Sequence, residues 1–217
     1  MKQLTIQTLL EEDLQVGERV GPAVAEKLGT IARGRFTVRL PEQKLKDKLS
    51  KYPPPENCQE LKPPVLHAEL GDKGFLDSGA KKSDWRSVKV QKMVCGAAAG
   101  ILLSMQKLHN SALPLAARLS DPRDKAQFDT ANETIASLGD VIALLGMDSQ
   151  EISMRRKYQL QTSLPKEVNS ICSNENMAGT NLLFGDDLDK ALRAAHESSK
   201  LGANKHGNHH YRPYQHK

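Results

Sequence analysis

The chain has 217 residues, enough for one sizeable domain or two small ones. Hydrophobic residues make up 38% of it and aromatic residues only 4%, so a buried core must consist mainly of aliphatic side chains. With 15 glycines and 11 prolines and no internal repeat, the composition excludes a collagen-like or low-complexity chain.

The formal net charge of +5 is unevenly placed along the chain. The excess of basic residues lies in residues 17–51 and 200–217, on either side of a near-neutral body. This placement is compatible with nucleic-acid contact through both ends of the chain, and equally with a solvated surface.

Cysteine usage and hydropathy bear on the compartment of the protein. The three cysteines are widely spaced and predict no disulfide framework, and the polar start of the chain has no apolar signal core. The longest apolar run, Met93 to Leu103, is too short to span a bilayer. We therefore expect a reduced, intracellular protein of the cytoplasm or nucleus, with no membrane partner.

The N-terminal region predicts helices over residues 1–16, 22–34 and 41–51. Pro22 and Pro41 open the second and third of these, because the missing N–H of proline costs nothing at the first helical position. The third helix has a basic face, which is formed by Lys44, Lys46, Lys48 and Lys51.

Residues 52–64 contain five of the eleven prolines. Proline removes a backbone donor and biases the preceding residue toward extended geometry, so we expect an extended, polyproline-type connector or clasp. Glycine, lysine, aspartate and serine dominate residues 71–82, and this composition predicts a loop.

A long helix is predicted next, capped by Ser83 or Asp84. Its apolar residues recur every three or four positions over about 25 residues. They include Val90, Val94, Ala97, Ala98, Ile101, Met105 and Leu108. Within this helix, Gly96 and Gly100 form a slender patch that a second helix could approach closely, although glycine weakens a helix by about 1 kcal/mol relative to alanine.

A second long helix should start at residues 121–122, an Asp-Pro pair, and end at Gly146. Asp148 or Ser149 would cap a further helix. The rest of the chain is expected to hold irregular structure over residues 162–183, a short helix after Asp186 and Asp187, and a disordered tail from Lys200.

These elements predict an all-α fold: a helical bundle with two long central helices, a Pro-rich extended connector and a disordered basic C-terminal tail. The corresponding regions are a basic N-terminal helical region (1–51), a connector (52–82), a central helical domain (83–199) and a tail (200–217).

Basic residues with interleaved tyrosines are candidates for nucleic-acid binding, since they can neutralise phosphates and stack on unpaired bases. Nothing in these residue types imposes a sequence preference, so we expect non-specific RNA or DNA contact, the alternative being solvated or solubilising surface. The candidates are Lys44, Lys46, Lys48, Lys51, Arg155, Arg156, Lys157, Lys205, Tyr211, Arg212, Tyr214 and Lys217.

Motifs for catalysis and metal binding are weak. Four histidines of the tail could bind zinc or copper, but no Cys-x-x-Cys pair accompanies them, and we expect no metal or cofactor. Gly185-Asp186-Asp187 resembles a polymerase motif, yet a helix follows it at once, so Asp186 as a helix cap and Asp187 beside the positive end of the helix dipole account for it better. We predict that the protein is not an enzyme.

Three segments together resemble the gag-like first-frame proteins of DIRS-type tyrosine-recombinase retrotransposons. They are Leu45 to Cys58 with its Lys-Tyr-Pro-Pro-Pro-Glu-Asn-Cys, Leu138 to Gly146 followed by Met154-Arg155-Arg156, and Leu182 to Leu188 with its Leu-Phe-Gly-Asp-Asp-Leu. The chain departs from that family at residues 70–72, where a tryptophan is expected, and in the scarcity of arginines in its tail.

The resemblance implies a protein of a mobile element, related to assembly or packaging of element RNA, in which Phe184 to Leu188 is a structural element. Our leading hypothesis is therefore a non-enzymatic structural protein that forms homo-oligomers and touches nucleic acid through its basic ends. The alternative is a protein–protein adaptor whose Pro-rich segment docks a partner.

Overall fold

The computed structural model describes residues 21–72, 74–173 and 181–205. These residues form helices and no strand, which confirms the all-α fold class. The chain divides into two compact units, residues 1–45 and residues 46–217. The helix predicted over residues 1–16 and all but the first residues of the predicted tail lie outside the described ranges.

Helix α2 spans Glu26–Thr37 and carries no buried residue. It starts four positions after Pro22 and runs through Gly34, so both predicted ends are wrong. Glu26 accepts a hydrogen bond from Arg33 at 2.7 Å, one of several local side-chain contacts that support the helix on its exposed surface.

Helix α3 spans Glu42–Lys51, as predicted from Pro41. Leu49 in its last turn and Tyr52 just after it pack against the glycine patch of α5, the helix that spans Ser78–Ala116. A Cβ at Gly96 would lie 2.6 Å from a methyl carbon of Leu49, and one at Gly100 would lie 3.4 Å from the ring of Tyr52. The close approach predicted for this patch is thus made within the chain, by Leu49 and Tyr52.

The start of α5 differs from the prediction. Asp77 caps the helix by accepting a hydrogen bond of 2.6 Å from the backbone N–H of Ala80, so the helix begins before Ser83 and Asp84. A short helix, α4 (Ala68–Asp72), also overlaps the first two residues of the loop expected over 71–82. The local composition predicts a loop, but Leu70 and Ala80 are buried in the core, and this packing overrides the weak propensity.

Helix α6 spans Pro122–Gln161 and begins at its predicted cap, Asp121, which accepts from the N–H of Arg123 at 2.8 Å. The predicted end at Gly146 is wrong, because the helix continues through it. Among the described glycines only Gly74 and Gly185 have the positive φ of a typical helix-ending glycine. The cost of a helical glycine, about 1 kcal/mol, is small beside the packing of a long helix on its neighbour.

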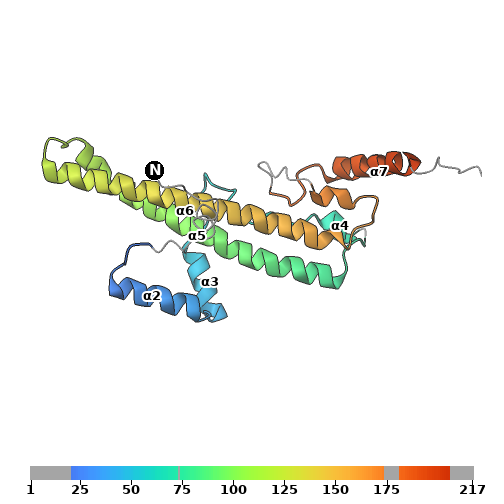
Figure 1. The fold of residues 1–217 in the computed structure, drawn as a ribbon, viewed down its shortest axis with the longest axis horizontal. Coiled ribbons are helices and arrows are strands. Elements are labelled where there is room, and N and C mark those ends of the chain that lie inside the picture. The colour runs from blue at the N-terminus through green and yellow to red at the C-terminus, as the bar shows by residue number, and fades with distance from the viewer. Residues whose placement is uncertain (1–20, 73, 174–180, 206–217) are drawn as a thin grey trace, which may run out of the picture. The chain divides into compact units, whose positions relative to one another are not determined.

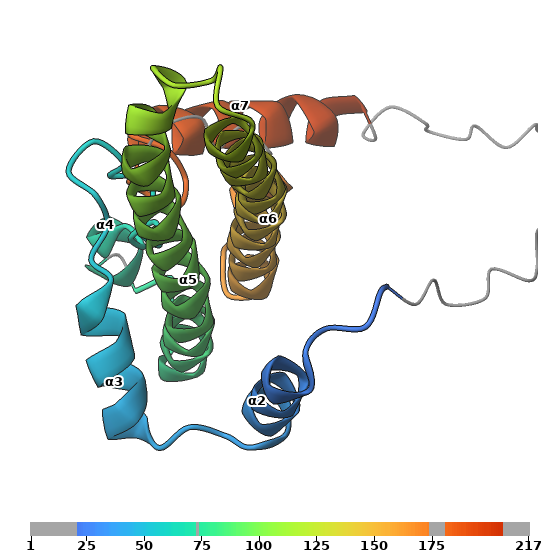
Figure 2. The same ribbon diagram turned by 90° about the vertical axis from the view of Figure 1, so that its left-hand side faces the viewer.

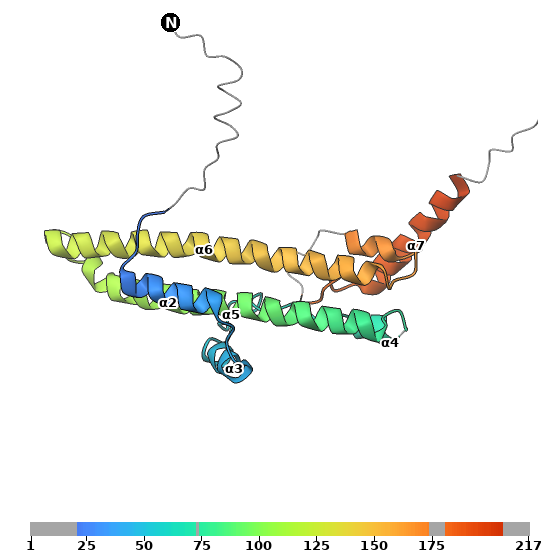
Figure 3. The same cartoon turned by 60° about the horizontal axis from the view of Figure 1, so that its bottom comes forward.

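Helices α5 and α6 lie side by side along their length and form an antiparallel hairpin (Figures 1 and 2). At one end of the hairpin, α4, a 3₁₀ helix (Asn169–Ser173) and α7 (Leu188–Lys205) gather around it (Figure 3). In the described part of the predicted irregular stretch (162–173 and 181–183), the only helix is this 3₁₀ helix. Helix α7 runs five residues beyond the predicted start of disorder.

The hydrophobic core lies at this end of the hairpin. It is built from α4, the start of α5, the end of α6 and the segments that follow. Its members are Leu70, Leu76, Ala80, Leu160, Leu164, Ile171, Cys172, Leu183, Phe184, Leu188, Leu192 and Ala195. Leu70, Leu76 and Ala80, which the sequence assigns to a connector, are thus part of the core.

Candidate functional site

A buried arginine joins the two long helices to the Pro-rich segment. The guanidinium Nε of Arg156 donates to Oδ1 of Asp84 at 2.7 Å, and its Nη1 donates to the carbonyl oxygen of Pro64 at 2.8 Å. Arg156 has 0% of its surface exposed. A planar, permanently charged fork of donors is suited to such a junction, because it can satisfy a carboxylate and a carbonyl at once.

A second layer of polar contacts extends this junction along the hairpin. Gln91 of α5 accepts from Arg156 at 3.1 Å, and its amide donates to the hydroxyl of Ser153 at 2.8 Å. The same amide donates to the carbonyl and the hydroxyl of Ser149, both at 3.0 Å. Every polar atom of Gln91 thus has a partner, as buried polar groups require.

The segment after Pro64 pairs with the far end of the chain. The N–H of Val65 donates to the carbonyl of Asn181 at 2.7 Å, and the carbonyl of Val65 accepts from the N–H of Leu183 at 2.9 Å. Nε2 of His67 lies 2.8 Å from the carbonyl oxygen of Gly185. Three contacts therefore hold the residues that directly follow the Pro-rich segment to residues 181–185.

The Leu-Phe-Gly-Asp-Asp-Leu segment has a structural explanation at each position tested. Phe184 and Leu188 are buried in the core, and Gly185 adopts φ +84°, a conformation that glycine tolerates best. Asp187 accepts a hydrogen bond of 3.0 Å from the N–H of Lys190 and so caps α7. The predicted cap, Asp186, is thus off by one residue.

Lys157 is buried beside Cys172 and Phe184. Its ammonium nitrogen lies 5.9 Å from the centre of the Phe184 ring. Desolvation lowers the pKa of Lys157, and desolvation raises the pKa of Cys172 to about 11 despite the nearby lysine. Cys172 is therefore held as a thiol.

The predicted nucleic-acid-binding residues separate into three groups. The four lysines of α3 and Arg155 are exposed. Arg156 and Lys157 are 0% and 1% exposed, so the prediction that they contact phosphate is wrong, because their charges are directed into the molecule. Tyr211, Arg212, Tyr214 and Lys217 lie outside the described residues, and the side chain of Lys205 is not described.

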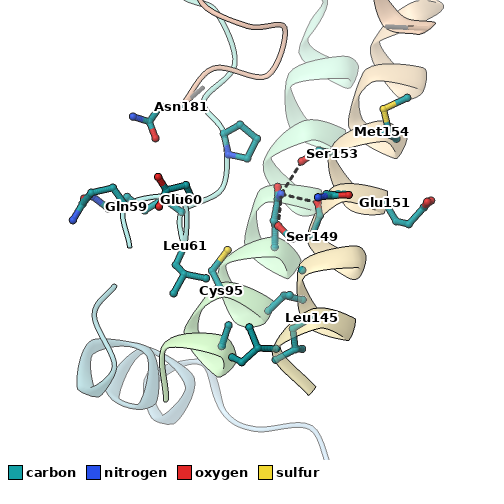
Figure 4. A pocket seen from close by; sticks show the side chains of 18 of the residues that line it. Gln59, Glu60, Leu61, Cys95, Leu145, Ser149, Glu151, Ser153, Met154 and Asn181 are labelled. Atoms are coloured by element: carbon teal, nitrogen blue, oxygen red, sulfur yellow. Dashed lines mark hydrogen bonds between the residues drawn. The ribbon is translucent and has the colours of Figure 1, made fainter. Parts of the chain in front are cut away.

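A cavity of about 840 Å³ lies between the Pro-rich segment, α5 and α6 (Figure 4). Leu61 points toward Cys95 across it, and Ser149 and Ser153 contribute hydroxyls that Gln91 already engages. Burial raises the pKa of Cys95, which disfavours a thiolate nucleophile there. In the described ranges, no three histidine, cysteine or acidic side chains lie close enough together to hold a metal ion.

The hairpin exposes apolar side chains away from the core, a feature that the sequence analysis missed. On α6, Leu144 and Met147 are 68% and 56% exposed, and on α5, Val90 and Leu103 are 46% and 38% exposed. The helical period assigns each apolar residue to a face of its helix, but it does not tell whether another part of the chain packs on that face. Long apolar stripes on two helices, with few further helices to cover them, are the signal that could have been used.

Helix α5 also has one 18-residue stretch apolar enough to cross a membrane by length and composition, and 22% of that stretch is buried. A core helix of a soluble protein meets the same criterion, so this stretch is weak evidence for a membrane.

Comparison with known proteins identifies one relationship. No curated protein and no solved structure matches the chain. A family model described as a domain of unknown function, DUF8747, matches residues 22–186, which include α2 to α6 and most of the Leu-Phe-Gly-Asp-Asp-Leu segment. Since this match covers well over half of the chain, the protein belongs to the DUF8747 family.

Proposed function

We propose that the protein is a non-enzymatic structural protein, similar in role to the gag-like proteins of DIRS-type retrotransposons, that self-associates and binds RNA or DNA without sequence preference. The observation that carries the proposal is the set of exposed apolar side chains on the α5–α6 hairpin, outside its core. Apolar patches on soluble proteins mark interaction sites, and a second copy of the chain is the partner always at hand.

The basic face of α3 supports the nucleic-acid half of the proposal. Lys44, Lys46, Lys48 and Lys51 are exposed on one short helix, and Arg155 is exposed on α6. Such residues attract phosphates and release condensed counterions, which yields affinity that falls with salt and does not depend on sequence. The protein would meet its RNA or DNA in the cytoplasm or the nucleus.

The packing of the Pro-rich segment argues against the adaptor alternative. Pro54, Pro55, Pro63 and Pro64 are each half-buried, and the carbonyl of Pro64 accepts from the buried Arg156. The segment also makes two turns, in which Cys58 donates to Pro55 and Leu61 donates to Cys58. A segment held in this way does not present the free polyproline ridge that docking grooves recognise.

Light scattering on a sizing column, with the ratio of absorbance at nucleic-acid and protein wavelengths recorded on the same peak, tests the proposal. We expect a mass of several subunits together with co-eluting nucleic acid that high salt removes. A monomer of 23.9 kDa, free of nucleic acid at low salt, would overturn the proposal.

A further inference from the structure

The amino-terminal part of α5 presents the one tryptophan of the chain to solvent. Trp85 is 61% exposed. Lys82 precedes it by three residues, and Lys89 and Lys92 follow it by four and by seven, which is the spacing of side chains on one helix face. Arg86 comes directly after the tryptophan and borders this face. We call these five residues the Trp85 face.

The Trp85 face is strongly basic. Lys82, Arg86 and Lys92 are exposed, and Nζ of Lys89 lies 5.6 Å from the centre of the Trp85 ring. The single acid of α5, Asp84, is only 7% exposed, and its carboxylate is engaged by Arg156 at 2.7 Å. No acid of α5 therefore offsets the positive charge of this face, and the face attracts polyanions.

The contact between the two long helices leaves the Trp85 face open. Asp84 and Gln91, which bond to residues of α6, lie about 100–120° around α5 from Trp85. Val94, which lines the groove between α5 and α6, lies on the opposite side of the helix from Trp85. The exposure of the tryptophan is thus not imposed by the packing of the hairpin.

The Trp85 face continues toward α3. Gly96 lies about three turns after Trp85 on the same side of α5, about 16 Å along the helix axis. Leu49 of α3 packs at this point, where a Cβ on Gly96 would lie 2.6 Å from its methyl carbon. Lys48 and Lys51 flank Leu49 in sequence and are exposed, so α3 places further cations at this end of the Trp85 face.

We propose that the Trp85 face binds single-stranded nucleic acid, with the indole ring stacked on an unpaired base and the surrounding cations on the neighbouring phosphates. The inference rests on the proposed nucleic-acid binding and adds to it a site, a stacking residue and a preference for unpaired strands. Aromatic rings among basic side chains bind single strands in this way without reading their sequence. None of these five residues is among the candidates that the sequence analysis indicates.

The composition of the Trp85 face favours nucleic acid over a lipid surface. A helix that lies on a membrane buries a broad apolar stripe, whereas the Trp85 face has one large apolar side chain among four cations. A ring beside cations matches the alternation of base and phosphate along an unpaired strand. In a duplex the bases already stack on each other, so the indole ring would find no free base.

Because Trp85 is the one tryptophan, its fluorescence reports on the site directly. Titration of the full chain with an unlabelled single-stranded DNA oligonucleotide of about 16 nucleotides should quench the emission, since a stacked base contacts the indole ring. The same oligonucleotide annealed to its complement should bind more weakly and quench less. Vesicles of anionic phospholipid should leave the emission unchanged.

Fluorescence anisotropy with the labelled oligonucleotide measures the effect of substitutions at the ring. Trp85→Ala should weaken binding at least about fivefold, and Trp85→Phe, which keeps an aromatic ring, should retain part of the affinity. The matched control is Tyr158→Ala, which removes a 49% exposed ring from α6 and should bind as the wild type does. Urea unfolding followed by circular dichroism shows that each variant is folded.

A pair of charge variants tests the phosphate contacts. Replacing Lys82 and Lys92 together by Gln should reduce the slope of log affinity against log salt. Replacing Lys166 and Lys190, which are exposed outside α5, removes the same charge and should leave the slope unchanged. Equal reductions in the two variants would contradict phosphate contacts at the Trp85 face.

The outcomes separate this site from the proposed function. If the wild type binds the single strand but its emission does not change and Trp85→Ala binds equally well, the Trp85 face is not the site, while nucleic-acid binding stands. Equal affinity for strand and duplex would contradict stacking. A change of emission with the vesicles and none with the oligonucleotide would overturn the proposal in favour of a lipid surface. If the wild type binds no nucleic acid at low salt, the nucleic-acid half of the proposed function fails together with this site.

Discussion

Arg156 and Asp84 form an ion pair inside the hairpin, with the guanidinium nitrogen 2.7 Å from the carboxylate oxygen and neither side chain more than 9% exposed. A buried ion pair is weak evidence of net stabilisation, because both charges have been taken out of water. The pair matters most when one partner is replaced, because the charge that remains is then buried without an opposite charge beside it.

We therefore expect Asp84→Asn to lower the free energy of unfolding by about 3–5 kcal/mol, since Arg156 would keep its charge and lose its carboxylate. The matched control is Arg155→Gln, one position away and exposed, which should change it by less than about 0.5 kcal/mol. Urea denaturation followed by circular dichroism measures both. Equal effects at the two positions would contradict the buried pair.

Glycines on the two long helices should respond oppositely to alanine. Nothing lies within 4 Å of a Cβ at Gly139 or Gly146, so alanine there should stabilise the protein by up to about 1 kcal/mol through helix propensity. At Gly96 the added methyl would meet Leu49, and the gain should be lost or reversed. Combining Gly96→Ala with Leu49→Ala should make the two changes less costly together than their sum. Thermal unfolding of the set decides the matter.

The two adjacent aspartates before α7 should differ in importance. Asp187→Ala removes the cap that bonds to the N–H of Lys190 and should cost about 1 kcal/mol. Asp186→Ala removes an exposed carboxylate and should cost less than about half of that. If Asp186 were the more costly position, the capping scheme would have to shift by one residue. Chemical denaturation of the two variants provides the comparison.

The three free cysteines should be chemically distinguishable. Burial raises the pKa of Cys95, and raises that of Cys172 to about 11, so both are protonated near neutral pH, whereas Cys58 is half-buried. Because the thiolate is the reactive form, iodoacetamide at about pH 8 should label Cys58 first in the folded protein and all three after unfolding in urea. Mass spectrometry of tryptic peptides reads out each site.

The lysines of α3 should govern the salt dependence of nucleic-acid binding. Replacing all four by Gln should reduce the slope of log affinity against log salt by about 0.7 for each lysine that contacts a phosphate of single-stranded nucleic acid. A control with Lys62, Lys125, Lys166 and Lys190 replaced removes the same charge elsewhere. Fluorescence anisotropy with a labelled oligonucleotide measures the slope, and an equal loss in both variants would show a response to net charge only.

Sequence-based predictions are correct where a local signal, such as a helix cap or a pair of small residues, agrees with the packing of the folded chain. Asp121 followed by proline marks the start of α6, and the spacing of Gly96 and Gly100 indicates a close contact that Leu49 and Tyr52 do make. Local rules fail where packing decides. From local sequence, Gly146 predicts a helix end and residues 71–82 predict a loop. In the structure, packing against residues distant in sequence offsets the low helix propensity, and a local window does not contain those residues.

The basic run at residues 155–157 shows the same limit for function. Three adjacent cations look alike in sequence, but successive residues of a helix point about 100° apart, so one faces solvent and two face the interior. The partner that explains the burial of Arg156 is Asp84, which lies more than seventy residues earlier in the chain. No local window of the sequence carries that information.

The pairing of Val65 with Asn181 and Leu183 has a consequence for how the chain folds. The α5–α6 hairpin lies entirely between these residues and joins neighbouring segments, so it has low contact order and can form early. Pairing Val65 with Leu183 closes a loop of more than a hundred residues, which is entropically costly in the unfolded chain. A formed hairpin lowers this cost because it already orders most of the loop. Folding should therefore proceed from the hairpin outward, with the Pro-rich segment and α7 joining last, and a nascent chain still lacking Leu183 would hold a formed hairpin above an unfinished core.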